Sequence, residues 1–306
     1  MAGGEAAFDG KAPGQERAKY TGAGPCSRKG EVVLTEYRES PAGGDGEARP
    51  SSGLLIASVG TSRETARKDA LEALEEAARR AYPGCRVEAA YTSGQVREEL
   101  QGRGIVVPSP QQALEGLLRQ GVQELTVQPT HLLPGREYGW LYATLQEYRE
   151  AFRVLKSGEP LLASRQDLRE TASLLSHRFP RQEGACVLLM GHGSPGAENR
   201  AYASLGRLLE IADRPDIRLA TLKGGLPLSD ALPVLRRMRV RRVLLAPLMV
   251  TAGQHAAECM ACDGADSWKS RLEAQGFAVE VRLAGLGEDP GFQRLFLRHI
   301  AQARPL

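Results

Sequence analysis

Short apolar runs alternate with amphipathic stretches from residue 54 onwards. The run at residues 54–59 is apolar except for one serine and stops at Gly60, which is typical of a buried strand that ends in a turn. The stretch that follows gathers small apolar residues on one helical face, namely Ala70, Leu74, Ala77, Ala78 and Ala81. The pattern therefore predicts a strand followed by a surface helix.

This strand-and-helix unit recurs along the chain. Further strands are predicted at residues 86–91, 124–128, 186–190, 217–221, 242–246 and 279–283. Further helices are predicted at residues 110–119, 138–152, 165–177, 197–213, 230–238, around Trp268 and at 290–302. Because strands joined by crossover helices run parallel, the order of elements predicts an α/β protein with parallel sheets.

The order of motifs restarts near residue 183, which indicates an internal repeat. Residues 192–194 (His-Gly-Ser) align with residues 59–61 (Val-Gly-Thr), each just after the first strand of its half. Residues 246–253 align with residues 128–135, and both segments have a glycine six residues after a proline. We therefore expect two similar, doubly wound parallel-sheet halves that face a central cleft, with the functional site at the carboxyl ends of the strands.

The expected domain organisation has three parts. Residues 1–52 contain ten glycines and one short apolar run, so they are predicted to be a disordered extension. Residues 53–182 form the N-terminal half, and residues 183–306 form the C-terminal half, which carries the histidines discussed below.

Composition narrows the function classes. The chain has 306 residues, with 40 Lys and Arg against 37 Asp and Glu, and this near balance argues against a nucleic-acid partner. No apolar run is long enough for a membrane span and no signal peptide is recognised, so we expect a cytoplasmic protein with no membrane partner. The odd number of cysteines predicts reduced thiols, at Cys26, Cys85, Cys186, Cys259 and Cys262.

Two histidines are placed where an open sheet builds its site. His192 follows an apolar strand and lies between glycines at the entrance to a helix, where neutral imidazole is favoured. His255 lies in the loop after the 242–246 strand, at the same edge of the same sheet, so the two rings are expected to face each other. Taken singly, each could instead be a helix-capping or solvated loop histidine.

The other histidines are weaker candidates. His131 lies at the matching edge of the first half. His177 and His299 fall late in predicted helices and are expected at the surface, near the negative end of the helix dipole. Trp140 and Trp268 are expected to be packing residues rather than ring-stacking partners.

Taken together, the motifs of this sequence resemble those of a known family. Residues 53–306 are similar to the anaerobic-type sirohydrochlorin cobaltochelatases, which are class II tetrapyrrole chelatases. The motifs that carry the resemblance are Gly60-Thr61-Ser62, Val127-Gln128-Pro129-Thr130-His131-Leu132-Leu133-Pro134-Gly135-Arg136-Glu137-Tyr138, Gly191-His192-Gly193-Ser194, and the segment from Pro247 through His255 to Lys269. The resemblance lies in the ordered set with its spacings, since each motif alone is weak.

The resemblance implies ATP-independent insertion of Co²⁺ into sirohydrochlorin, a step of cobalamin biosynthesis, with the macrocycle between the two halves and no organic cofactor. It also implies that His192 and His255 are the catalytic metal ligands, with His192 the proton acceptor. Imidazole suits this chemistry because it binds borderline divalent ions and accepts protons. Fe²⁺ insertion to give sirohaem needs the same geometry, so Fe²⁺ and Ni²⁺ stay open as substrates.

One position departs from the family. The resemblance implies a glutamate ligand in a Thr-x-Glu-Gly segment, which here reads Thr221-Leu222-Lys223-Gly224. A protonated lysine is no metal ligand, so a non-catalytic tetrapyrrole- or metal-binding protein of the same fold is an alternative. Glu258 or a thiolate of the His255-x3-Cys259-x2-Cys262 pattern could supply the missing ligand if the segment is helical, or both cysteines could be small buried residues.

The macrocycle carries several carboxylates, so the cleft is expected to offer them donors. The candidates are backbone amides, hydroxyls and cations at Gly60, Thr61, Ser62, Arg63, Arg136, Gly193, Ser194 and Lys223. Arg63 could equally be a first-turn surface residue. Glu137 aligns with His255 in the internal repeat, either as an accessory acid or as an ordinary helix-starting carboxylate. Whether the chain forms a homo-oligomer is left open.

Overall fold

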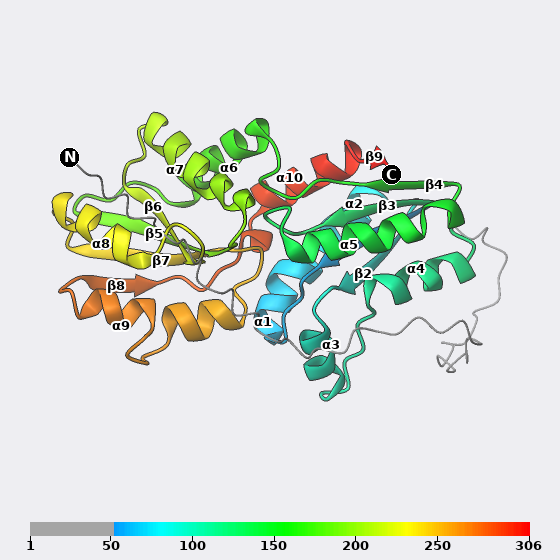
Figure 1. Ribbon diagram of the computed structural model, residues 1–306, viewed down its shortest axis with the longest axis horizontal. Coiled ribbons are helices and arrows are strands. Elements are labelled where there is room, and N and C mark those ends of the chain that lie inside the picture. Colours follow the sequence, from blue (N-terminus) through cyan, green and yellow to red (C-terminus); the bar gives the residue numbers. More distant parts are fainter. Residues whose placement is uncertain (1–51) are drawn as a thin grey trace, which may run out of the picture. The chain divides into compact units, whose positions relative to one another are not determined.

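The computed structural model describes residues 52–306 (Figure 1). The predicted disordered extension, residues 1–52, lies outside the described residues except for Ser52, which begins the first strand. Within this part of the chain, every helix is too short or too polar to cross a bilayer. Its four cysteines, Cys85, Cys186, Cys259 and Cys262, are free, as the odd cysteine count predicts.

The first sheet has the strand order β2-β1-β3-β4-β9. Strand β1 (Ser52–Ser58) lies between β2 (Arg86–Tyr91) and β3 (Glu124–Pro129) and runs parallel to both. Strand β4 (Val154–Ser157) extends the sheet in the same direction. The short strand β9 (Arg304–Pro305) pairs antiparallel with β4, so the C-terminus of the chain completes the sheet of the first half.

The second sheet repeats this order. Strand β5 (Ala185–Gly193) lies between β6 (Ile217–Lys223) and β7 (Arg242–Leu248), and β8 (Ala278–Val281) follows β7 at the edge. All four strands are parallel. The predicted fold class, α/β with two similar parallel-sheet halves, is confirmed, and in both halves the first strand is central because the chain winds outwards in two directions from it.

Helices cover both faces of each sheet. They are α1 (Glu64–Ala66), α2 (Ala73–Ala81), α3 (Gly94–Gln101), α4 (Pro110–Arg119), α5 (Arg136–Glu147), α6 (Arg165–Arg178), α7 (Arg200–Ile211), α8 (Leu228–Arg237), α9 (Trp268–Glu273) and α10 (Pro290–Ala301). Alternate residues of β1 serve opposite faces: Leu54 and Ile56 pack with α2 and α10, whereas Leu55 and Ala57 pack with α4 and α5. This alternation follows from the two-residue period of a strand.

The central strand β5 divides its side chains in the same way. Val187 and Leu189 belong to the core that also contains α6 and α7, while Leu188 and Met190 pack with α8, α9 and the π-helical segment Ala256–Ala261 (η4). The first of these cores includes residues of both sheets. The two halves of residues 52–306 therefore share one continuous apolar core.

Helices α6 and α10 each pack against the half other than the one predicted from their order in the chain. Helix α6, the last helix before residue 183, packs against α7, and Arg214 donates hydrogen bonds to the carbonyl oxygens of Ser176 and Phe179 at the end of α6. Helix α10, expected to complete the second half, packs instead against α2 and β3 of the first (Figure 1). Hydrophobic periodicity identifies the buried face of a helix but not the sheet that covers it.

The contact between α6 and α10 buries a histidine that was expected at the surface. His299 is only 4% exposed, so that prediction is wrong, whereas His177 is exposed as predicted. The Nε2 atom of His299 lies 2.8 Å from Oδ1 of Asp167, and its Nδ1 atom lies 3.0 Å from the carbonyl oxygen of Glu159. Burial is tolerated because each ring nitrogen meets an oxygen.

Most element boundaries agree with the prediction, and the differences have local causes. Helix α3 was not predicted, because it buries only Leu100; its start is marked by Ser93, whose side chain accepts a hydrogen bond from the amide of Val96. Strand β4 was missed because it is only four residues long. Strand β5 continues through Gly193, so His192 lies within the end of the strand rather than after it.

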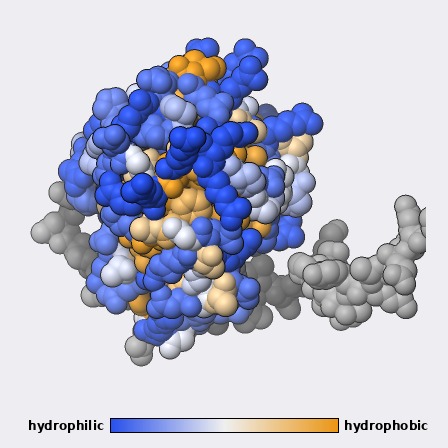
Figure 2. All heavy atoms as spheres, turned by 90° about the vertical axis from the view of Figure 1, so that its left-hand side faces the viewer, coloured by the Kyte–Doolittle hydropathy of each residue, from blue (hydrophilic) through white to orange (hydrophobic). Residues whose placement is uncertain are grey.

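The outer surface of the second half is mainly hydrophilic. Figure 2 shows a narrow apolar strip framed by hydrophilic residues on the side where α8 lies in Figure 1. Among the described residues, the large hydrophobic side chains that are exposed are few and scattered along the sequence: Val59, Val106, Trp140, Tyr142, Ile211 and Leu283. Single exposed apolar residues are common on protein surfaces.

Candidate metal centre and its cleft

The two candidate histidines meet at the carboxyl edge of the second sheet. The ring centroids of His192 and His255 are 5.1 Å apart, with an angle of 49° between the ring planes. His192 is half-buried at the end of β5, and His255 is exposed as the N-cap residue of η4. Two imidazoles this close can share one divalent cation, since the geometry leaves room for metal–nitrogen bonds of about 2 Å.

Glycines shape the strand end that presents His192. Gly193 has φ +72°, and a methyl group on it would lie 1.8 Å from the carbonyl oxygen of Lys223. A methyl group on Gly191 would lie 2.7 Å from Cε1 of the buried Tyr202. Both positions therefore exclude larger side chains, and the tight packing fixes the backbone on either side of His192.

The environment of His192 favours neutral imidazole. Its pKa is lowered, chiefly because burial disfavours the charged ring; the Lys223 ammonium and His255 act in the same direction. Nδ1 lies 3.0 Å from the carbonyl oxygen of Gly193, so Nδ1 carries the hydrogen and donates it. The lone pair of Nε2 is then available for a metal ion or a proton.

Lys223 stands beside this pair, where the family resemblance implies a carboxylate. It is the exposed last residue of β6, and its backbone pairs with Gly193. Its ammonium is near enough to contribute to the lowered pKa of His192. A fixed positive charge at this place weakens the binding of a bare cation and favours the binding of an anion.

The η4 segment and its C-cap residue carry two thiols, and only the first of them lies against His255. Sγ of Cys259 lies 3.7 Å from Nδ1 of His255, whereas the Cys262 thiol donates to the carbonyl oxygen of Glu258 at 2.8 Å. The three side chains of the His-x3-Cys-x2-Cys pattern do not share one face, because the segment is π-helical and ends at Cys262 in an extended conformation.

The alternative roles suggested for these cysteines can be compared with their burial. Cys259 is half-buried and Cys262 exposed, so neither is the small buried residue of the alternative interpretation. Glu258 is exposed and accepts hydrogen bonds from the Gln254 side chain. Among residues 52–306, no three histidine, cysteine or acidic side chains are assembled into a group that could hold a metal ion.

The two carboxyl edges contact each other through residues that the internal repeat makes equivalent. A methyl group on Gly253 of the second half would lie 3.1 Å from Oγ1 of Thr61 in the first. A methyl group on Gly135 of the first half would lie 4.0 Å from Oγ of Ser194 and 3.6 Å from Oε1 of Glu198 in the second. The edges therefore face each other with approximate twofold symmetry, as the repeat predicts.

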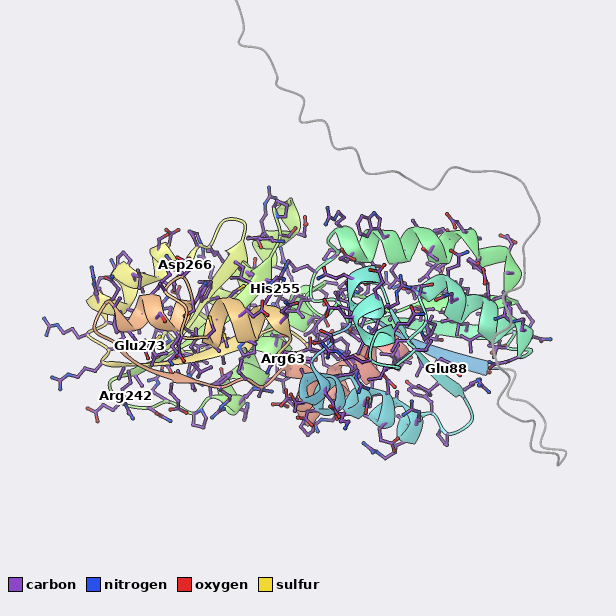
Figure 3. All side chains as sticks on the ribbon, turned by 90° about the horizontal axis from the view of Figure 1, so that it is seen from below. Arg63, Glu88, Arg242, His255, Asp266 and Glu273 are labelled. Atoms are coloured by element: carbon purple, nitrogen blue, oxygen red, sulfur yellow. The ribbon has the colours of Figure 1, made fainter. Side chains whose placement is uncertain are left out.

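This arrangement brings the turn after β1 close to the histidine pair. Figure 3 shows Arg63 and His255 near the place where the two halves meet, and Thr61 and Gly253 are in contact there. Arg63 is exposed as the N-cap residue of α1. A cation from the first half thus stands near the candidate metal centre of the second.

Several of the residues predicted to bind the carboxylates already make hydrogen bonds within the protein, and of these Ser194 uses its own donors. Oγ1 of the buried Thr61 accepts a hydrogen bond from the Arg63 amide at 3.2 Å. The Ser62 carbonyl oxygen accepts one from the Arg103 side chain at 2.8 Å. The amide of Ser194 donates to the side chain of Asn199 at 3.1 Å, and its hydroxyl donates to the carboxylate of Glu198.

Arg136 carries the remaining cationic donor predicted in the first half. It is exposed at the start of α5, with its guanidinium 4.9 Å from the centroid of the Trp140 ring. Trp140 is 56% exposed, so its prediction as a packing residue is wrong: it lies outside the helix face that buries Leu141 and Leu145. Trp268 is 4% exposed and packs in the core as predicted.

His131 is buried away from solvent rather than presented to it. It is 8% exposed, and neither ring nitrogen has a hydrogen-bond partner within residues 52–306. Burial lowers its pKa to about 4, so the ring is neutral at neutral pH. Its ring packs edge-on against Tyr138, with centroids 6.2 Å apart.

Two residues of the site were not predicted. The Glu198 carboxylate lies beside Gly135 of the first half, and the Ser194 hydroxyl that donates to it keeps its pKa below the ordinary value. Its position in the turn after β5 was a signal that could have found it, because the carboxyl ends of parallel strands build the site. Tyr202, which packs under Gly191, had no signal beyond its helical position.

An α/β protein with two repeated parallel-sheet halves and a histidine pair at one carboxyl edge has the architecture of a class II chelatase. Residues 52–304 match the family described as Cobalt chelatase (CbiK). The chain therefore belongs to the cobalt chelatase (CbiK) family, and the resemblance given by its motifs is confirmed.

Curated relatives and solved structures agree with this assignment. The chain is 34% identical over 252 residues to the sirohydrochlorin cobaltochelatase of Salmonella typhimurium, covering 82% of this chain and 95% of that protein. It is 33% identical over 255 residues to the sirohydrochlorin cobaltochelatase CbiKC of Nitratidesulfovibrio vulgaris, covering 82% and 90%. The structure of SirB from Bacillus subtilis with Fe³⁺ has a similar fold, with a TM-score of 0.58 at 16% identity and coverage of 82% and 94%.

Proposed function

We propose that this chain is a sirohydrochlorin cobaltochelatase that inserts Co²⁺ into the macrocycle without ATP. The observation that carries the proposal is the 5.1 Å separation of the His192 and His255 rings at the carboxyl edge that faces the other half. The named activity of relatives at 33–34% identity supports the choice of cobalt and of sirohydrochlorin as substrates. A cytoplasmic location, with no nucleic-acid or membrane partner, is part of the proposal.

In the proposed reaction, His192 and His255 hold the incoming Co²⁺ and release it to the pyrrole nitrogens. Four cobalt–nitrogen bonds form as two pyrrole N–H bonds are broken, so two protons leave the macrocycle for each ion inserted. Neutral imidazole can serve both steps, since it binds the ion and then takes up a proton once the ion has moved. The lowered pKa of His192 lets it pass that proton on to water near neutral pH.

The cationic side chains are proposed to place the macrocycle through its carboxylates. Arg63 and Arg136 are exposed on the first half, and Lys223 is exposed beside His192 on the second. Ion pairs from both halves would fix the orientation of the ring in the cleft. In this proposal, Lys223 serves the macrocycle, and the two histidines alone bind the metal ion.

Anaerobic absorbance spectroscopy of purified protein with sirohydrochlorin and Co²⁺ tests the proposal. We expect His192→Gln and His255→Gln each to reduce the enzymatic insertion rate by about 100-fold or more, because each removes a proton-accepting ligand. His177→Gln, at an exposed position on α6, is the matched control and should retain the rate.

The same assay distinguishes the alternatives. A faster insertion rate with Fe²⁺ or Ni²⁺ than with Co²⁺ would show that the faster ion, and not Co²⁺, is the substrate metal. Spectral changes on mixing protein with the ring, without any metal-dependent increase in rate, would instead establish a tetrapyrrole-binding protein.

A further inference from the structure

The histidine pair differs in how its two rings are held. Nδ1 of His192 is fixed by a backbone carbonyl oxygen of the next residue, at 3.0 Å. The ring of His255 is exposed, and its Nδ1 atom faces the sulfur of Cys259 at 3.7 Å. A histidine that binds a metal through one nitrogen is commonly oriented by a hydrogen bond from the other.

We propose that Cys259 is a positioning residue for His255: its sulfur accepts a hydrogen bond from Nδ1–H, which leaves the Nε2 lone pair to face the metal ion. Both rings would then present Nε2 to the cation, because Nδ1 of each ring donates to an acceptor close by in the chain. The inference rests on the proposed function in so far as it takes His255 to be a metal ligand.

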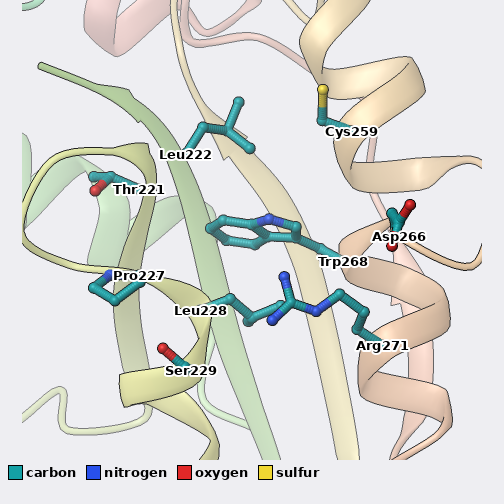
Figure 4. Close-up of a pocket in the computed structure, with 9 residues that line it drawn as sticks. All are labelled: Thr221, Leu222, Pro227, Leu228, Ser229, Cys259, Asp266, Trp268 and Arg271. Atoms are coloured by element: carbon teal, nitrogen blue, oxygen red, sulfur yellow. The ribbon is translucent and has the colours of Figure 1, made fainter.

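The η4 segment is rigid enough for this role. Its residues Ala256 and Met260 are fully buried, in the same core as Trp268 and Leu272. Cys259 itself lies at the edge of a pocket of about 260 Å³, with Trp268 further inside (Figure 4). Because the backbone on both sides of Cys259 is anchored, its sulfur is a fixed point for the exposed ring.

The second thiol of the segment provides a matched control. Cys262 is only three residues further on, but its sulfur donates to the carbonyl oxygen of Glu258 rather than to a ring. Removing either thiol makes a similar chemical change in the same short segment. Only the loss of Cys259 should affect the orientation and tautomer of His255.

The first measurement needs neither metal nor macrocycle. Proton–nitrogen correlation spectra of ¹⁵N-histidine-labelled full-length protein distinguish Nδ1–H from Nε2–H rings, and a His255→Gln variant assigns the His255 signals. We expect the Nδ1–H tautomer in the unaltered protein and in Cys262→Ala, and a mixture or the Nε2–H tautomer in Cys259→Ala. Cys259→Ser, whose hydroxyl oxygen is also an acceptor, should restore the Nδ1–H form.

The second measurement is Co²⁺ binding by calorimetry and absorption. Cys259→Ala should weaken Co²⁺ binding by about 10- to 100-fold, as the loss of such a supporting hydrogen bond usually does. Cys262→Ala should bind like the unaltered protein, and Cys259→Ser should recover most of the loss. Circular dichroism checks that each variant is folded.

Three outcomes would overturn the inference: an Nε2–H tautomer of His255 in the unaltered protein, equal effects of the two alanine variants, or a sulfur-to-cobalt charge-transfer band, which would make Cys259 a ligand. Failure of the proposed function is distinguishable from these results. A protein that shows the expected tautomers but never accelerates metal insertion would refute only the chelatase activity.

Discussion

His131 is expected to make the folded protein sensitive to acid. Its imidazole is buried, and neither ring nitrogen has a partner within the described part of the chain. Protonation would therefore place an unpaired charge in an apolar environment, which is why burial lowers the pKa from 6.5 to about 4. His131 therefore binds a proton more weakly in the folded protein than in the unfolded chain.

The size and sign of the effect follow from that pKa. Because the folded pKa is below the unfolded one, the contribution to stability is fully present above about pH 6.5 and is lost as the pH falls towards the folded pKa of about 4. Each pKa unit corresponds to about 1.4 kcal/mol, so the full loss is about 3.5 kcal/mol. Roughly 2 kcal/mol of it should appear between about pH 8 and about pH 5.

Urea unfolding of His131→Leu and the unaltered protein at these two pH values measures the effect. Leucine has a similar volume and does not titrate, so the variant should stay within about 1.5 kcal/mol of the unaltered protein near pH 8 and lose about 2 kcal/mol less on acidification. His177→Gln, at an exposed position, controls for replacing a histidine. An unchanged pH dependence in His131→Leu would refute the reasoning.

Three further predictions concern the site and its support. Lys223→Gln should weaken equilibrium binding of the macrocycle roughly fivefold, the effect of losing about 1 kcal/mol from an exposed ion pair, and Lys223→Glu should weaken it more; stronger catalysis by the Glu variant would show a lost ligand instead. Gly193→Ala should lower the melting temperature well beyond Gly104→Ala, because both have positive φ but only the first places its methyl group 1.8 Å from a carbonyl oxygen. Asp167→Asn should cost about 3 kcal/mol in urea unfolding, because it removes the buried carboxylate that hydrogen-bonds His299 and pairs with Arg298.

The central part of the site could be predicted because local signals determine it. An apolar run followed by glycines places His192 at a strand end, and the rule that parallel strands end at one edge places His255 beside it. The Val59-Gly60-Thr61 repeat of this motif predicted that the two edges face each other. The contact of Thr61 with Gly253 and the equivalent approach of Ser194 to Gly135 agree with that expectation.

The parts that could not be predicted depend on contacts between distant segments. His299 is buried because Asp167, 132 residues earlier in the chain, provides its partner, and no local pattern relates the two. The packing of α10 on the first sheet also depends on contacts between distant segments. The hydrophobic pattern of the helix is compatible with packing on either half. Cys259 contacts His255, as the i, i+4 spacing suggested, but Cys262, seven residues after His255, does not join them, because the segment is π-helical rather than α-helical.

The repeat also explains why the metal ion would reach the macrocycle from the second half only. In the first half, Val59 occupies the position of His192, and Glu137 that of His255. Valine has no lone pair to offer, so the first half lacks a matching pair of ligands, although its edge has the same backbone form, with positive φ at Gly60 as at Gly193. On the proposed function, a ring held between the edges would meet Co²⁺ on the face towards the second half. Its other face would lie against the partly exposed Val59, which suits an apolar macrocycle surface.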